Sequence, residues 1–149
     1  MKPETPTRLD LDTYLPYLVN RVGSQIAQAF TEEARRQGTT LQGWRVLAAL
    51  AHHGPLSLSA LSAATSIELS TLSRLVQQME RSGLVNRDRM EGDQRVVTIS
   101  RTDEGKRITF ALIPVARAYE QRALAGFSED ESALLRDMLR RIFTNVHGM

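Results

Sequence analysis

Side chains that could bind phosphate and polar base edges gather around one predicted turn. Arg87, Arg89 and Arg95 flank the turn "MEGD" in the stretch "RDRMEGDQRVVTIS" at 87–100. A guanidinium is planar and always charged, and it donates through a rigid fork that suits phosphates and base edges. Arginine supplies 17 of the 19 basic residues. A GC-rich genome would produce the same bias, so the positions of the arginines must decide the interpretation.

A second group of polar residues precedes this turn. Short donors at the start of a helix suit phosphate, although Ser57 is equally suited to capping that helix. Thr71 can contact a thymine methyl group, and Arg74 can bind a guanine or hold a phosphate. The alternative is an ordinary solvated helix face. The predicted members of this group are Ser57, Ser59, Ser70, Thr71, Ser73, Arg74 and Gln77.

Hydrophobic periodicity predicts the elements that position these residues. Apolar residues at three-to-four spacing indicate helices, and alternation over 95–100 indicates a strand. Thr40 and Thr102 are predicted caps, Ser128 with Glu131 forms a predicted capping box, and Pro114 is expected to bend its helix. The expected helices cover 10–37, 41–52, 57–65, 69–82, 103–125 and 128–146, with a hairpin over 85–89 and 95–100.

This order predicts a mainly α fold, a winged helix-turn-helix with about six helices and one β-hairpin wing. A short helix, a tight turn and a longer helix with a polar outer face form the helix-turn-helix pattern, and the hairpin follows directly. The length of 149 residues predicts one domain, 1–149, with the winged region at 41–100.

Composition excludes several classes of site. The chain has no cysteine, which excludes disulfides and thiolate chemistry. We find no Gly-rich phosphate loop, no HExxH and no serine elbow, so we expect no enzyme. His52 and His53 diverge on a helix and cannot chelate one metal, and we expect no metal and no cofactor. Without an apolar run of membrane length or a signal peptide, the prediction is a cytoplasmic protein that does not bind membranes.

The sequence resembles the MarR family of bacterial transcriptional regulators over about residues 14–146. The resemblance is carried by "WRVLAAL" at 44–50, "SRLVQQMERSGLV" at 73–85, "GDQR" at 92–95 and "TDEG" at 102–105. It implies an obligate homodimer in which the helices at 10–37 and 103–146 interlock. It also implies control by a small, often aromatic or phenolic, effector.

The resemblance further assigns roles to the wing. It implies that Arg95 enters the minor groove of double-stranded DNA while Asp93 restrains the wing. A narrow minor groove concentrates negative potential, and a guanidinium dehydrates more easily than an ammonium. Arg87 and Arg89 on the opposing strand are expected at flanking phosphates, with a salt bridge as the alternative for Arg87.

Two positions depart from the family pattern. Arg101 replaces the usual leucine, and we expect it to be more exposed or to point toward a phosphate. Glu68 replaces the usual small cap of the 69–82 helix. Glutamate caps less well than serine or aspartate, so Ser66 or Ser70 is expected to take that role. A carboxylate there would either repel phosphate or accept from a cytosine amino group.

An effector pocket is predicted between the first, second and fifth helices. An aromatic wall with one cation suits an aromatic carboxylate. Trp44 on an apolar face is also typical of an ordinary core residue. The candidates are Tyr17, Arg21, Trp44, His52 and His53.

The leading hypothesis is a ligand-responsive repressor that binds a pseudo-palindromic operator as a homodimer. One alternative is a winged-helix module that contacts another protein. The other is an effector-independent DNA-binding activator.

Overall fold

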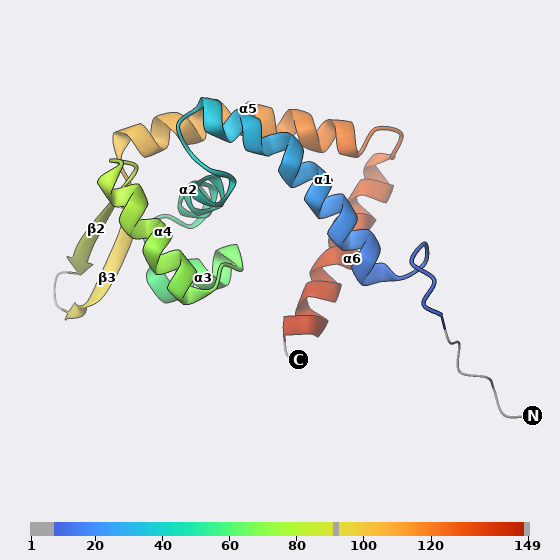
Figure 1. Ribbon diagram of the computed structural model, residues 1–149, viewed down its shortest axis with the longest axis horizontal. Helices are drawn as coiled ribbons and strands as arrows, with labels where there is room; N and C mark the ends of the chain where they lie inside the picture. Colours follow the sequence, from blue (N-terminus) through green and yellow to red (C-terminus); the bar gives the residue numbers. More distant parts are fainter. Residues whose placement is uncertain (1–7, 91–92, 148–149) are drawn as a thin grey trace, which may run out of the picture. The chain divides into compact units, whose positions relative to one another are not determined.

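The computed structural model describes residues 8–90 and 93–147, with only the backbone described at 90 and 93–95. The described part contains six helices and three short strands (Figure 1). In chain order the elements are α1 (Leu15–Arg36), α2 (Leu41–His53), β1 (Leu56–Ser57), α3 (Leu58–Thr65), α4 (Leu69–Arg81), β2 (Val85–Met90), β3 (Asp93–Arg101), α5 (Asp103–Ala123) and α6 (Glu129–His147). The predicted winged helix-turn-helix is confirmed.

The chain divides into two compact units, Met1–Val115 and Ala116–Met149. The division falls inside α5, which continues as a helix past Pro114. The expectation of a single domain stays a prediction.

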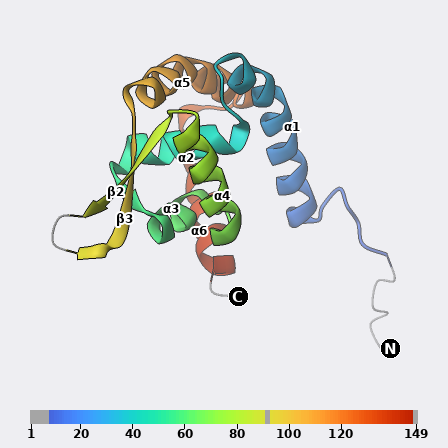
Figure 2. The same cartoon turned by 60° about the vertical axis from the view of Figure 1, so that its left-hand side comes forward.

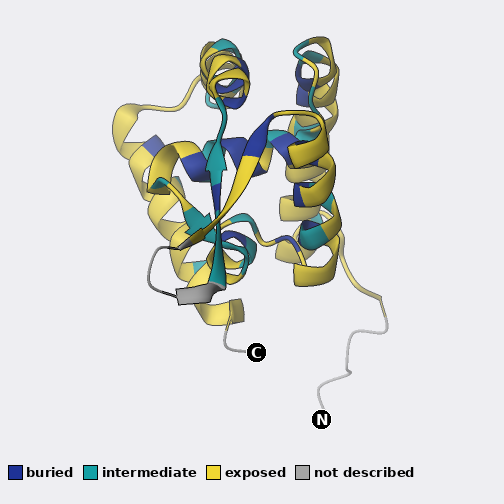
Figure 3. Ribbon diagram, turned by 90° about the vertical axis from the view of Figure 1, so that its left-hand side faces the viewer, coloured by how far each residue is buried: buried dark blue, intermediate teal, exposed yellow. Residues whose placement is uncertain are grey.

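The first unit has a hydrophobic core of its own. Helices α1 to α4 and the first part of α5 contribute to it, together with strands β2 and β3. Figure 3 shows the buried positions gathered in the middle of this unit. Burying one such aliphatic side chain contributes about 1.5–3 kcal/mol relative to leaving it exposed. The valine, leucine and isoleucine side chains that are less than 2% exposed are Val46, Leu47, Leu61, Leu72, Val76, Val85, Ile99, Ile108 and Leu112.

The three strands form an antiparallel sheet in the order β1-β3-β2. Ile99 pairs with Leu56 on one side and with Arg87 on the other. The register shifts between Arg89 and Met90, near the end of the hairpin. Figure 2 shows the β2–β3 hairpin extending beyond the helices of its unit. Strand β1 was not predicted, because two residues show no periodicity.

A close backbone contact joins the hairpin to α5. The Thr102 hydroxyl donates to the Gly83 carbonyl at 2.6 Å and accepts from the Gly105 N–H at 3.0 Å, which confirms Thr102 as the cap. A methyl group at Gly105 would overlap the carbonyl oxygen of Leu84. Only glycine fits there, so the base of the wing is held tightly to α5.

Helix α1 begins later than predicted, at Leu15 rather than near Asp10. The Asp10 carboxylate accepts from the Asp12 N–H at 3.1 Å and from the Thr13 hydroxyl at 3.0 Å, which forms a turn instead. Pro16 then occupies the first turn of the helix, where its missing N–H costs nothing.

Much of the apolar surface of α1 and α6 is exposed in this single chain. On α1 only Phe30 and Ala34 are buried, whereas Val22 is 60% exposed. On α6 Phe143 is 51% exposed, and Leu134, Met138, Leu139 and Val146 are also exposed. The helix itself is well formed, since Ser128 and Glu131 make the predicted capping box. Among the described residues, we find no helix whose length and apolarity would let it span a lipid bilayer.

Candidate nucleic-acid interface

The α3–turn–α4 segment is fixed by local hydrogen bonds and one buried anchor. The Ser57 hydroxyl caps α3 by accepting from the Ala60 N–H at 3.2 Å. Ser66 adopts a left-handed conformation with φ of 54°, which turns the chain. Ile67 is 5% exposed, and its carbonyl accepts from the Ser62 hydroxyl at 2.6 Å. The turn therefore presents α4 in one orientation.

The cap of α4 differs from the prediction. Neither Ser66 nor Ser70 caps the helix; the Glu68 carboxylate does. It accepts from the backbone N–H groups of Ser70 and Thr71, each at 3.0 Å. The hydroxyls of Ser70 and Thr71 donate to the same carboxylate. Average capping preferences did not predict this, because the extra hydrogen bonds depend on hydroxyls two and three residues later.

These hydrogen bonds stabilise the ionised form of Glu68. The Ser70 hydroxyl, followed by the two backbone N–H groups, lowers the pKa of Glu68 from 4.5 to about 2. Hydrogen bonds to a carboxylate favour its charged form. The start of α4 therefore carries a full negative charge at neutral pH.

The rest of α4 separates into a buried face and a polar face. Leu72, Val76 and Met79 are buried. Ser70, Thr71, Arg74 and Gln77 are exposed, and Ser73 is half-buried. This matches the predicted amphipathic pattern and leaves five polar side chains available on one helix.

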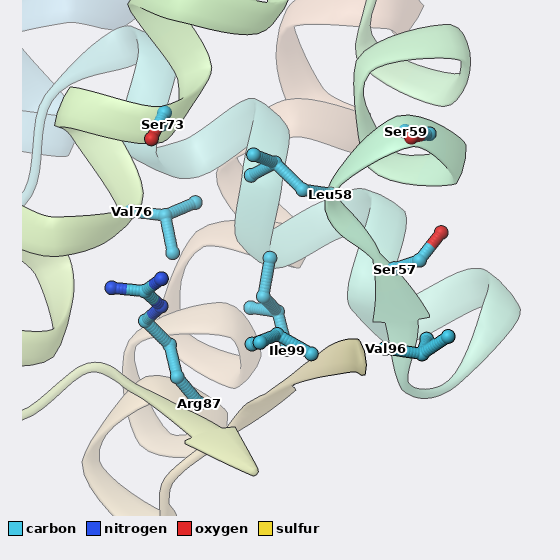
Figure 4. A pocket seen from close by; sticks show the side chains of 9 residues that line it. Ser57, Leu58, Ser59, Ser73, Val76, Arg87, Val96 and Ile99 are labelled. Carbon is cyan, nitrogen blue, oxygen red and sulfur yellow. The ribbon is translucent and has the colours of Figure 1, made fainter. Parts of the chain in front are cut away.

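A hollow of about 410 Å³ lies between α3, α4 and the wing (Figure 4). Ser57, Ser59, Ser73 and Arg87 contribute polar groups to its lining, above an apolar floor that includes Ile99. Figure 4 shows the Arg87 side chain rising from β2 toward Val76 of α4. The structure thus brings four of the predicted residues to one hollow.

Arg87 is paired within the protein. Its Nη1 lies 3.6 Å from Oε2 of Glu80 near the end of α4. This is the salt bridge given above as the alternative for Arg87. Because the Arg87 side chain remains 33% exposed, the pair does not remove it from solvent. Glu80 was missed by the sequence reasoning, since the contact joins a helix to a strand.

The outer wing is described in part. Arg89 is exposed on β2 and pairs in register with Val97. The side chains of Asp93 and Arg95 lie outside the described part of the structure, so their predicted roles stay predictions. Arg101 is half-buried opposite Val85, and the expectation that it points toward a phosphate stays a prediction.

The predicted effector residues form three separate contacts. The Arg21 guanidinium lies 5.6 Å from the centre of the Tyr17 ring on α1. Trp44 packs against Phe30 with ring centres 5.4 Å apart. His52 and His53 meet edge to face at the end of α2. None of these five residues lines the hollow beside α4, and the contact with Phe30 favours packing as the role of Trp44.

The described residues contain no group of three or more His, Asp or Glu side chains placed to hold a metal ion. The polar groups on α4 and in the hollow beside it are hydroxyls, guanidinium groups, side-chain amides and single carboxylates. This arrangement can donate and accept hydrogen bonds and can attract anions.

Comparison with known proteins places the chain in a family. Residues 39–97, which span the helix-turn-helix and most of the wing, match the MarR family. The transcriptional regulator PecS of Dickeya dadantii is 32% identical over 142 residues, covering 91% of this chain and 85% of PecS. The chain belongs to the MarR family. It is therefore a transcriptional regulator, as the resemblance implied.

Two further comparisons extend over nearly the whole MarR-family chain. The transcriptional repressor NicR of Pseudomonas putida is 28% identical, covering 95% of this chain and 94% of NicR. The crystal structure of the PcaV regulator from Streptomyces coelicolor, in complex with its natural ligand, is 26% identical with a TM-score of 0.80. That match covers 92% of this chain and 96% of PcaV. The similarity therefore includes the terminal helices as well as the winged region.

Proposed function

We propose that this MarR-family regulator binds double-stranded DNA through α4 and the β2–β3 wing. The observation that carries the proposal is the polar face of α4 beside the hollow that holds Ser57, Ser59, Ser73 and Arg87. Helices of this kind enter the major groove by their N-terminal half. Ser70, Thr71, Ser73, Arg74 and Gln77 are then the candidates for base and phosphate contacts.

The wing adds backbone contacts in this proposal. Arg89 is exposed on β2, and Arg87 reaches the hollow that borders α3. Phosphate contacts fix the register of a protein on DNA without reading its sequence. Arg95, with Asp93, is proposed to reach the minor groove at the end of the hairpin.

We propose that the working form is a homodimer. The exposed apolar residues of α1 and α6, Val22 and Phe143 among them, need a partner of the same character. A second copy supplies such a surface by symmetry. Two α4 helices would then read half-sites about 34 Å apart in a pseudo-palindromic operator.

We also propose that the protein represses transcription and responds to a small aromatic or phenolic effector. The names of two relatives support this: NicR is a repressor, and PcaV was crystallised with its natural ligand. Tyr17, Arg21, Trp44, His52 and His53 remain the candidate contacts. An effector would act by favouring a dimer conformation that fits the operator poorly. We also propose that the protein acts in the cytoplasm. It would do so as a single MarR-type domain without catalytic activity.

Binding to duplex DNA over a range of salt concentrations tests the proposal. Fluorescence anisotropy with random duplex and with operators selected from a random library should give tighter binding to selected sequences. The logarithm of the association constant should fall steeply with the logarithm of salt, by about 0.9 for each phosphate contacted. No binding to any duplex at low salt would overturn the proposal and favour a protein partner for this surface.

A further inference from the structure

The start of α4 presents hydrogen-bond acceptors rather than donors. Oε1 of Glu68 accepts from the Ser70 N–H, and Oε2 accepts from the Thr71 N–H and from both hydroxyls. An ionised carboxylate can only accept, so the Ser70 and Thr71 hydroxyls must donate their hydrogens to it. Each of these two hydroxyls can then only accept a further hydrogen bond, through the lone pairs of its oxygen. Oε1 receives only one of these hydrogen bonds, so it keeps the capacity to accept another.

The neighbouring side chain is apolar and exposed. Leu69 is 46% exposed at the first position of α4 and follows Glu68 in the sequence. Donors come later on the same helix, with Arg74 and Gln77 both exposed. The leading end of α4 therefore combines acceptors with one apolar surface.

The four bases differ in how well their major-groove edges can bind such a surface. Guanine presents two acceptors and thymine presents one, so both repel an ionised carboxylate. Adenine carries an amino donor, but its N7 acceptor lies directly beside it. Cytosine has no acceptor of its own in this groove: its amino donor lies between the O6 of the paired guanine and the apolar C5 edge, whereas the adenine amino group has an acceptor on each side. Phosphate is disfavoured by charge.

We propose that Glu68 determines base specificity by accepting a hydrogen bond from the amino group of one cytosine in each half-site, while Leu69 packs against the C5 edge of that base. This inference rests on the proposed function. It also decides between the two alternatives left open for the carboxylate, namely phosphate repulsion alone and cytosine recognition.

Glu68→Ser is the informative variant, because serine keeps a good helix cap and removes the charge. Operators are selected from random duplex with the wild type and with Glu68→Ser. The wild type should require cytosine at one position in each half-site, and the variant should lose that requirement while other positions are unchanged. Glu104→Gln, in the first turn of α5, gives the same change in net charge and should leave the profile unaltered.

The contribution of the amino group alone is tested with a duplex in which 2-pyrimidinone, which lacks that group, replaces the cytosine. Wild-type affinity should fall roughly fivefold per half-site, and affinity of Glu68→Ser should not change. An equal loss in both proteins, or identical profiles in the selection, would overturn the assignment while leaving DNA binding intact. Failure of the wild type to select any sequence would instead remove the proposed function, and this assignment with it.

Discussion

The Glu80–Arg87 ion pair should weaken the attraction between the wing and DNA. Arg87 lines the hollow beside α3 and α4, and Glu80 lies 3.6 Å from its guanidinium. A phosphate that enters this hollow must compete with the Glu80 carboxylate for Arg87. We therefore expect Glu80→Gln to strengthen binding to DNA.

The size of the effect follows from the separation and the exposure of the pair. At 3.6 Å, two unit charges in a water-like dielectric interact by about 1 kcal/mol. Both side chains are at least one-third exposed, for which measured pair energies of about 0.2–1 kcal/mol are typical. Glu80→Gln should thus raise affinity by up to about fivefold per half-site. The melting temperature should change by no more than about 4 °C.

Anisotropy titrations at several salt concentrations give the decisive measurement. Arg87→Ala should lower the salt slope by about 0.9 per half-site, because one phosphate contact is lost. In the Arg87→Ala background, Glu80→Gln should have a much smaller effect. Glu104→Gln on α5 controls for net charge alone. If Arg87→Ala leaves the slope unchanged, Arg87 only braces α4 against the wing and the reasoning is refuted.

Four further predictions concern the wing, the dimer, the α5 contact and the Glu68 cap. Arg95→Ala should weaken operator binding strongly in gel-shift titrations and leave the melting temperature almost unchanged; unaltered affinity would contradict the proposed minor-groove contact. Phe143→Asp should convert a dimer into monomers in sedimentation velocity, because a charge on the α6 apolar face cannot be buried in an interface; a wild type that sediments as a monomer would remove the proposal. Gly105→Ala should lower the free energy of unfolding by roughly 1–3 kcal/mol in denaturant titrations, because its methyl group overlaps the Leu84 carbonyl. Since the folded-state pKa of Glu68 lies below its ordinary value of 4.5, its cap stabilises the protein above that pH and is lost as pH falls toward about 2; NMR shifts of the Ser70 amide should titrate near pH 2, and a midpoint near 4.5 would show that the cap does not form in solution.

Most elements could be predicted from the sequence because their signals are local. Thr40, Ser57 and Thr102 each accept from a backbone N–H three residues later, as their residue types predict. The buried side of α4 follows from the spacing of Leu72, Val76 and Met79, and all of its predicted polar residues face away from the core or border the hollow. Capping hydrogen bonds and the spacing of buried residues both involve residues within about one helical turn of each other. Neither signal therefore depends on a contact with a distant segment.

The parts that could not be predicted depend on contacts between distant segments. Strand β1 exists because Leu56 and Ser57 pair with Ile99 and Thr98, some forty residues later. Arg87 meets Glu80 only because β2 folds back beside α4. The apolar stripe of α1 was visible in the sequence, but the pattern did not distinguish Phe30, which packs on Trp44, from Val22, which is exposed.

The core and the proposed DNA-binding surface are linked through the rotation of α4 about its axis. Leu72 and Val76 are buried on one side, and Arg74, between them in sequence, is exposed on the other. The turn cannot shift to compensate, because Ile67 is buried and its carbonyl is bonded to Ser62. A change in the volume of Leu72 or Val76 that rotates α4 would therefore move Glu68, Arg74 and Gln77 together relative to the bases. In the proposed binding mode these groups must meet base edges within hydrogen-bond distance, whereas the proposed attraction of Arg87 and Arg89 to phosphate tolerates such a shift. Repacking this core should consequently reduce discrimination between operators more than it reduces affinity for random duplex.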